Sequence, residues 1–181
     1  GDHRDLHSFP TRRSPIYSLD EDFEVIRKNF SEKAGSNYAA SRGEFLNGKI
    51  MAAYLGFEFI DAAEVVRFDE NGDFQSEITN EIMSARLEKA KNAVIPGFYG
   101  ATEEGRVVTF SRGGSDITGS LVARAVNADL YENWTDVSGF LIADPRIVKG
   151  SKSIETITYK ELRELSYMGA SVLHEDAIFP V

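Results

Sequence analysis

Hydrophobic residues recur at regular spacing along the chain from about residue 19 onward. Phe23, Ile26 and Phe30 lie on one side of a charged segment and predict a short helix that ends near Gly35. The same helical spacing returns in three further segments: 39–56, 78–92 and the stretch that begins at Thr158 with Leu162, Leu165 and Met168. The chain is therefore predicted to be rich in amphipathic helices.

Short apolar runs between these helices predict strands at 57–61, 93–95, 106–110 and 129–134. Residues 98–100 are predicted to form a loop at the carboxyl end of the strand 93–95, the edge where ligands bind in open α/β sheets. Alternating strands and helices predict an α/β fold with a mainly parallel sheet that is covered on both faces.

A Gly-Gly loop at 111–116 joins the predicted strand 106–110 to a helix that contains Ile117 and Leu121. Adjacent glycines permit positive φ and close approach of another group, and a helix start favours an anion. Ser115 and Asp116 are both N-cap residue types. The loop is either a capped turn or a ligand site. Arg112 and Asp116 favour the ligand site, because both charge signs suit a small zwitterion or a phosphate.

The helix 39–56 carries a narrow stripe of small residues with one carboxylate in it. Ala40, Glu44, Gly48, Ala52 and Gly56 recur every four residues. Small residues let a ligand or another backbone come close. Glu44 is then either a solvated residue or a pocket residue, and the spacing alone leaves both open.

Composition narrows the possible functions. The chain has 181 residues and a net charge of −9, which disfavours nonspecific nucleic-acid binding but leaves nucleotide binding open. It has no cysteine, so disulfides, Cys-based zinc sites and thiol catalysis are excluded, and a reducing compartment is expected. Its three histidines form no metal-ligand pattern, and no run approaches the roughly 20 apolar residues that span a bilayer.

The first 17 residues show no hydrophobic period. His7–Ser14 resembles the translation of a common sequencing adapter, so we expect residues 1–17 to be a non-native tail and residues 18–181 to form the domain. A natural basic tail with Arg12 and Arg13 is the alternative. At the other end, we expect the domain to be cut at Val181.

Several motifs, in order along the chain, together resemble the catalytic domain of aspartate kinases. The resemblance covers roughly residues 19–181 and includes the helix that carries Glu44. Its other motifs are Ser111–Asp116, Trp134–Gly139, Asp144–Arg146 and Glu161–His174. Because several motifs occur in the right order, the resemblance is specific in a way that a single Gly-Gly loop is not.

This resemblance implies the amino-acid kinase fold, a three-layer αβα sandwich of the carbamate kinase-like type. It implies transfer of the ATP γ-phosphoryl group to the β-carboxylate of L-aspartate, with Mg²⁺ bound to the phosphates. That reaction is the first step of lysine, threonine and methionine biosynthesis. The parent enzyme is expected to be cytoplasmic and homo-oligomeric, with neither a nucleic-acid nor a membrane partner.

The resemblance also assigns roles to individual residues. Arg112 would bind the substrate's α-carboxylate, Glu44 its ammonium group, and Asp116 would help to position the reacting groups. The expected substrate-binding set is Glu44, Phe98, Arg112, Gly113, Gly114 and Ser115. The expected nucleotide-binding set is Thr135, Asp136, Asp144 and Arg146, and no residue is expected to bind a metal.

Four departures from the family pattern stand out. The chain lacks the Lys-Phe-Gly-Gly strand with which the family opens, and because the lysine of that strand neutralises the transferring phosphoryl group, we expect this partial domain to be inactive alone. The regulatory domains that usually follow in the family are also missing. Leu141 replaces a frequent aromatic residue, and Ser171 replaces a frequent lysine. Two alternatives stay open: another amino-acid kinase, of the glutamate or acetylglutamate type, or a noncatalytic ligand-binding derivative.

Overall fold

The computed structural model of the protein describes residues 18–134, 139–143 and 147–167. The predicted tail at 1–17 and the predicted helix cap at Gly169 lie outside these ranges. The described elements are α1 (Asp20–Ser31), α2 (Ser36–Leu55), β1 (Glu58–Phe59), α3 (Ala62–Val65), α4 (Ser76–Leu87), β2 (Ala93–Val94), β3 (Tyr99–Ala101), β4 (Val107–Thr109), α5 (Gly114–Ala125) and α6 (Tyr159–Tyr167).

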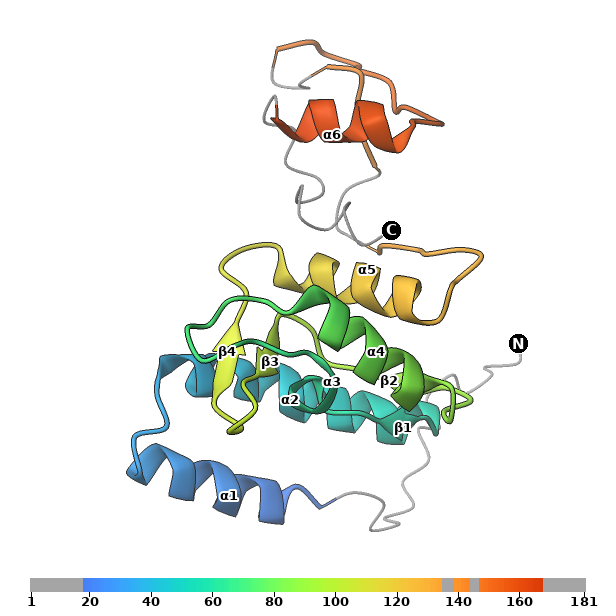
Figure 1. Cartoon of the computed structure of the whole chain (residues 1–181). Helices are drawn as coiled ribbons and strands as arrows, with labels where there is room; N and C mark the ends of the chain where they lie inside the picture. The colour runs from blue at the N-terminus through green and yellow to red at the C-terminus, as the bar shows by residue number, and fades with distance from the viewer. Residues whose placement is uncertain (1–17, 135–138, 144–146, 168–181) are drawn as a thin grey trace, which may run out of the picture.

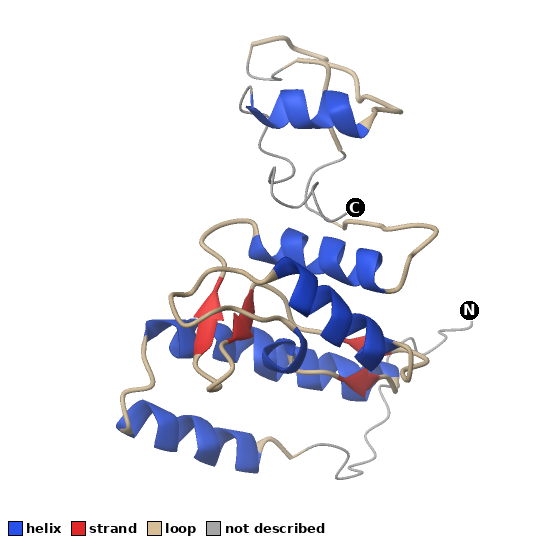
Figure 2. Ribbon diagram, in the orientation of Figure 1, coloured by secondary structure: helices blue, strands red, loops and turns tan. Residues whose placement is uncertain are grey.

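Helices enclose the strands on both sides, as the alternating pattern predicts. β1 pairs in parallel with β2, and α3 and α4 form the connection between the two strands. α2 packs against β1, β2 and β4, while α4 packs against α5 (Figure 1). Figure 2 shows the short strands in red among these helices, with α1 at the bottom of the view below α2. The described part is therefore an α/β body with helices on both faces of its strands.

β3 and β4 form an antiparallel hairpin, which corrects the prediction of a loop at 98–100. Ala101 also donates its N–H to the carbonyl of Val66 at 3.0 Å, so β3 is held on both edges. A Cβ at Gly100 would lie 2.4 Å from that carbonyl oxygen, which is too close for any other residue. Residues 99–101 form a strand because they pair with Val66 and β4, although glycine lowers the intrinsic strand propensity of this segment.

The hydrophobic core lies between the strands and α3, α4 and α5. Ala62 and Val65 enter it from α3, and Met83 enters it from α4. The whole buried cluster comprises Ile60, Ala62, Val65, Val66, Phe68, Met83, Tyr99, Val108, Ile117 and Leu121. Since α5 contributes Ile117 and Leu121, burial of its apolar face fixes where the Gly-rich loop before it must lie.

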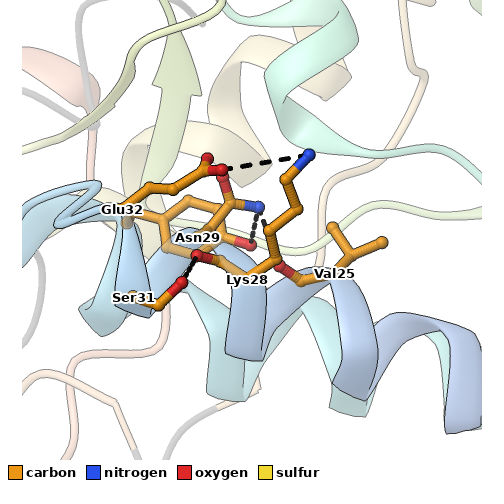
Figure 3. A network of polar contacts seen from close by, with 6 residues as sticks. Val25, Lys28, Asn29, Ser31 and Glu32 are labelled. Carbon is orange, nitrogen blue, oxygen red and sulfur yellow. Dashed lines mark hydrogen bonds and ion pairs between the residues drawn. The ribbon is translucent and has the colours of Figure 1, made fainter.

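Polar contacts fix the end of α1 and its connection to α2 (Figure 3). The Asn29 side chain donates to the carbonyl of Val25 at 2.9 Å and to the hydroxyl of Tyr38, on α2, at 3.1 Å. Ser31 donates to the carbonyl of Lys28 at 2.7 Å. These bonds confirm that the first helix ends just before Gly35, which has a φ of 95° and precedes α2.

Residues 129–134 do not form a strand, so that prediction is wrong. An apolar run becomes a strand only where another strand edge is available to pair with it, and no described residue pairs with this segment. Instead Tyr131 and Asn133 contact α5, while Trp134 is 88% exposed.

α6 begins with a reciprocal pair of contacts at Thr158, where the sequence predicts a helix start. The Thr158 hydroxyl donates to the Glu161 carboxylate at 2.7 Å, and the Glu161 N–H donates back to that hydroxyl at 3.3 Å. The predicted position of Leu162 on the helix is confirmed. Across 18–134, 139–143 and 147–167, none of the helices combines the length and apolar character that a membrane span requires.

Candidate active site

The Gly-rich loop leads from β4 directly into α5, and its two glycines have different functions. Gly113 is the N-cap and adopts the left-handed conformation, with a φ of 60°. Gly114 is already helical. Ser115 and Asp116 are N-cap residue types but do not cap the helix, because both lie in its first turn and the cap makes no side-chain hydrogen bond.

Gly114 is needed because two neighbouring segments approach it closely. A Cβ at this position would lie 2.7 Å from Phe98 Cα and 2.9 Å from Phe110 Cβ. Gly97 meets the same turn, since a Cβ there would lie 3.0 Å from Ser115 Cα. The loop after β2 therefore packs directly on the first turn of α5, which confirms the close approach that the Gly-Gly pair predicts.

Phe98 occupies a backbone conformation that side-chain-bearing residues seldom adopt, with a φ of 63°. Its N–H donates to Thr118 Oγ1 at 3.1 Å, and its carbonyl accepts the N–H of Phe110 at 2.9 Å. Phe110 is itself packed against Phe68 and Phe74, with ring centroids 5.0 and 5.2 Å away. The surrounding structure thus holds a strained residue beside the Gly-rich loop.

Glu44 lies on the α2 face that meets the ends of β4 and β2. Asn37, seven residues earlier on the same face, accepts a hydrogen bond from Thr109 of β4 at 3.2 Å. Gly48, one turn later, lies against Phe59 and Pro96. Glu44 itself is exposed between these two contacts. Glu44 therefore lies on the α2 face that meets both β4, which leads to the Gly-rich loop, and the segment after β2.

Arg112 is also exposed and lies three residues beyond Thr109. Neither Arg112 nor Glu44 has an ion-pair or hydrogen-bond partner among the residues that the structure describes. The α2 face of Glu44 and the strand that leads to Arg112 meet at the bond between Asn37 and Thr109. One exposed acid and one exposed base therefore lie on two segments that this bond joins.

Asp116 is partly buried and is held by a residue that the sequence reading missed. Asn133 donates its side-chain N–H to Asp116 Oδ1 at 3.2 Å. Burial raises the pKa of Tyr131, and the charge of Asp116 raises it further. Both contacts come from the segment predicted as a strand. Asn133 is one of three polar or charged residues in this segment, so the sequence gave no signal that distinguished it.

A buried polar group lies behind Glu44 and Phe98, and the sequence reading missed it as well. Arg42 is 9% exposed, and its guanidinium carbon lies 4.4 Å from the ring centroid of Tyr38 and 4.5 Å from that of Phe45. Tyr99 donates its hydroxyl to Asp61 at 2.7 Å. Burial raises the pKa of Tyr99, and the negative charge of Asp61 raises it further. Arg42 stands two residues before Glu44, and nothing in the sequence indicates that this arginine is buried.

A cavity of about 610 Å³ borders the Gly-rich loop. Its wall includes Ser115, Thr118 and Val122 on α5, Gly97 from the segment after β2, and Tyr131. Its volume is in the range of small-molecule sites. Among residues 18–134, 139–143 and 147–167, no three acidic or histidine side chains gather closely enough to hold a metal ion.

The expected nucleotide-binding residues Thr135, Asp136, Asp144 and Arg146 all lie outside the described residues. The described structure therefore brings together one part of the expected site. Phe98, Gly113, Gly114, Ser115 and Asp116 are adjacent, and Glu44 and Arg112 lie on the elements that flank them.

This architecture defines an α/β protein with a Gly-rich helix start suited to a small anionic ligand. The family model described as the amino acid kinase family matches residues 4–181, and the chain belongs to that family. Aspartokinase 3 of Bacillus subtilis is 41% identical over 150 residues, which cover 76% of this chain and 32% of that protein. The aspartokinase of Rickettsia conorii is 35% identical over 157 residues, which cover 82% and 39% of the two chains.

The chain is also similar to solved structures of aspartate kinases. The crystal structure of Clostridium acetobutylicum aspartate kinase is 60% identical, with a TM-score of 0.84, over 91% of this chain and 38% of that one. E. coli aspartokinase III in complex with aspartate and ADP is 28% identical, with a TM-score of 0.77, over 93% and 42%. The predicted resemblance and fold class are confirmed, and the chain spans about a third to two fifths of the length of these relatives.

Proposed function

We propose that the intact protein containing this domain is an aspartate kinase. It transfers the γ-phosphoryl group of ATP to the β-carboxylate of L-aspartate and forms 4-phospho-L-aspartate and ADP, as the first step of lysine, threonine and methionine biosynthesis. The observation that carries the proposal is the junction of the Glu44 face with the strand leading to Arg112, beside Phe98 and Gly114. The 60% identity to an aspartate kinase over nine tenths of the chain supports the same substrate.

Charge complementarity suggests which residue binds each of the two charged groups on the α-carbon of aspartate. Arg112 binds the α-carboxylate, because a guanidinium matches the two carboxylate oxygens with parallel N–H donors. Glu44 binds the α-ammonium group. Both side chains are exposed, so each meets its ligand without first breaking a described ion pair. A substrate lacking a free ammonium group, such as an N-acetylated amino acid, would leave Glu44 without its partner.

The acceptor needs no general base, since a β-carboxylate with a pKa near about 3.9 is already ionised at neutral pH. One of its oxygens forms a bond to the γ-phosphorus as the bond from that phosphorus to the ADP oxygen breaks. The main difficulty is repulsion between two anions, so catalysis depends on positioning and positive potential. The start of α5 and the Arg112 guanidinium supply that potential on this domain.

The residues proposed to bind ATP are Thr135, Asp136, Asp144 and Arg146, and Mg²⁺ would bind together with the ATP phosphates. Asp116 fits such an ion. It is partly exposed, and Asn133 is its only hydrogen-bond partner among the described residues. Mg²⁺ is commonly bound by one or two carboxylates together with substrate phosphates, and it neutralises phosphate charge when bound. Asp116 also orients the reacting groups through its place in the first turn of α5.

Kinetics on the intact protein test these roles. Glu44→Ala and Arg112→Ala are each expected to raise the aspartate KM by about tenfold or more, because each removes a charged hydrogen bond, and to leave the ATP KM within about twofold. Glu103→Ala and Arg27→Ala remove exposed charges elsewhere and serve as matched controls. An unchanged aspartate KM in both site variants would refute the assignment.

The intact enzyme is further proposed to be cytoplasmic, where ATP and aspartate are available, and homo-oligomeric. Exposed apolar side chains on α1, α2 and the turn after α2 support association through that side of the domain. Phe30 is 52% exposed and Tyr54 is 82% exposed. Sedimentation velocity of the intact protein tests this, and a monomer at all concentrations would contradict it.

A further inference from the structure

Thr118 joins two segments of the candidate site through a single hydroxyl. Its Oγ1 accepts the N–H of Phe98 at 3.1 Å and donates to the carbonyl of Gly114 at 2.8 Å. The side chain is 3% exposed, so water does not readily replace either bond. The first contact spans 20 residues of sequence, and the second closes one turn of α5.

The bond to Gly114 alone has an ordinary explanation. Threonine in a helix frequently donates to the carbonyl four residues earlier. That bond uses the one proton of the hydroxyl and leaves its lone pairs free to accept. The Phe98 amide occupies one of them, so the hydroxyl has a long-range partner that helix geometry does not require.

The Phe98 backbone needs such a partner. Its φ of 63° is unfavourable for a residue with a Cβ, and strained residues persist only where their surroundings hold them. Gly114 lets Phe98 come within contact of α5, and the Thr118 hydroxyl fixes the direction of the Phe98 amide there. Without the hydroxyl, this amide would lack the only acceptor that the described residues give it.

We propose that Thr118 is a positioning residue for aspartate binding. It holds Phe98 and the Gly113-Gly114 turn at a fixed separation, so that the substrate meets a preformed pocket. The inference rests on the proposed function, because Phe98 and Gly114 are assigned there to the aspartate site. Thr118 acts through these neighbours and need not touch the substrate itself.

Two substitutions in the intact protein separate the hydroxyl from the shape of the side chain. Thr118→Val keeps the shape and removes the hydroxyl, and it is expected to raise the aspartate KM by about tenfold with the ATP KM within about twofold. Thr118→Ser restores the hydroxyl and is expected to return the aspartate KM to within about threefold of the wild type. A purely structural role would lower thermal stability without this split between the two substrates or its rescue by serine.

Backbone hydrogen exchange of the wild-type protein provides a measurement that does not depend on whether the valine variant folds. The Phe98 amide is expected to exchange slowly without substrate, and exchange at the rate of an exposed amide would overturn the proposal. So would an unchanged aspartate KM in Thr118→Val when Glu44→Ala and Arg112→Ala do raise it. If those two variants leave the aspartate KM unchanged, the proposed function fails first, and the Thr118 inference fails with it.

Discussion

The hydroxyl of Tyr99, which is fully buried, donates a 2.7 Å hydrogen bond to Oδ1 of Asp61. The same carboxylate oxygen accepts the N–H of Ala63 at 3.0 Å and so caps α3. One carboxylate therefore ties the start of α3 to β3, immediately after Phe98. The contacts of Asp61 therefore link the stability of the core to the position of Phe98 in the candidate site.

Removing the hydroxyl should destabilise the fold. Tyr99→Phe keeps the ring and deletes one buried hydrogen bond to a carboxylate, so we expect the free energy of unfolding to fall by about 1–2 kcal/mol. Chemical denaturation of the intact protein measures this. Tyr54→Phe is the matched control, because its side chain is 82% exposed, and a change above about 0.5 kcal/mol there would weaken the argument.

The same tyrosine predicts a loss of stability at alkaline pH. Its pKa is raised above the ordinary value of 10.0, first by burial and then by the charge of Asp61. In this pH range the unfolded state loses its proton first, so stability is intact below about pH 10 and falls by about 1.4 kcal/mol per pH unit above it. The stability gap between wild type and Tyr99→Phe should narrow by about 1 kcal/mol from pH 9 to pH 11. A gap that is independent of pH would contradict the buried, neutral hydroxyl.

The close approach at Gly114 predicts a strong effect of one methyl group. Gly114→Ala places a Cβ 2.7 Å from Phe98 Cα, so we expect a loss of about 1–3 kcal/mol although alanine favours helices. Gly43→Ala is the control, because nothing lies within 4 Å of a Cβ there. It should be neutral or stabilising by up to about 1 kcal/mol. Equal effects in thermal unfolding would show that the contact with Phe98 is unimportant.

An ion pair between α1 and α2 should stabilise the domain measurably. Lys49 Nζ lies 2.6 Å from Asp22 Oδ2, and both side chains are at most 20% exposed. Asp22→Asn is expected to lower the free energy of unfolding by about 1–2 kcal/mol. Glu24→Gln breaks an exposed pair with Arg27 and should cost less than about 0.5 kcal/mol. Denaturation curves that shift equally for both variants would refute the prediction.

Hydrophobic spacing predicted α1 and α5, because Ile26, Ile117 and Leu121 carry the apolar faces that these helices bury. It did not predict the short helix α3. It failed where long-range partners decide the structure. β3 is a strand because its backbone pairs with Val66 and β4, although Gly100 weakens the local signal. The segment 129–134 is not a strand because no described edge pairs with it.

The residues of the candidate site likewise comprise some that the sequence predicts and others that only the fold reveals. Glu44, Arg112 and the glycines were predicted as site residues from residue type, spacing and family resemblance. Arg42 and Asn133 were missed, since their importance depends on which rings or carboxylates the fold brings to them. Thr118 sits in an ordinary helical position, and only its bond to Phe98 distinguishes it.

The most direct test of the central claim is the substrate preference of the intact wild-type protein with ATP and Mg²⁺. Acyl phosphate formation is measured for L-aspartate, L-glutamate and N-acetyl-L-glutamate by trapping with hydroxylamine. We predict that the kcat/KM for aspartate exceeds both others by about 100-fold or more, because Glu44 and Arg112 suit a free amino acid and the similar proteins are aspartate kinases. A preference for either glutamate substrate, or aspartate binding without phosphorylation, would contradict the account.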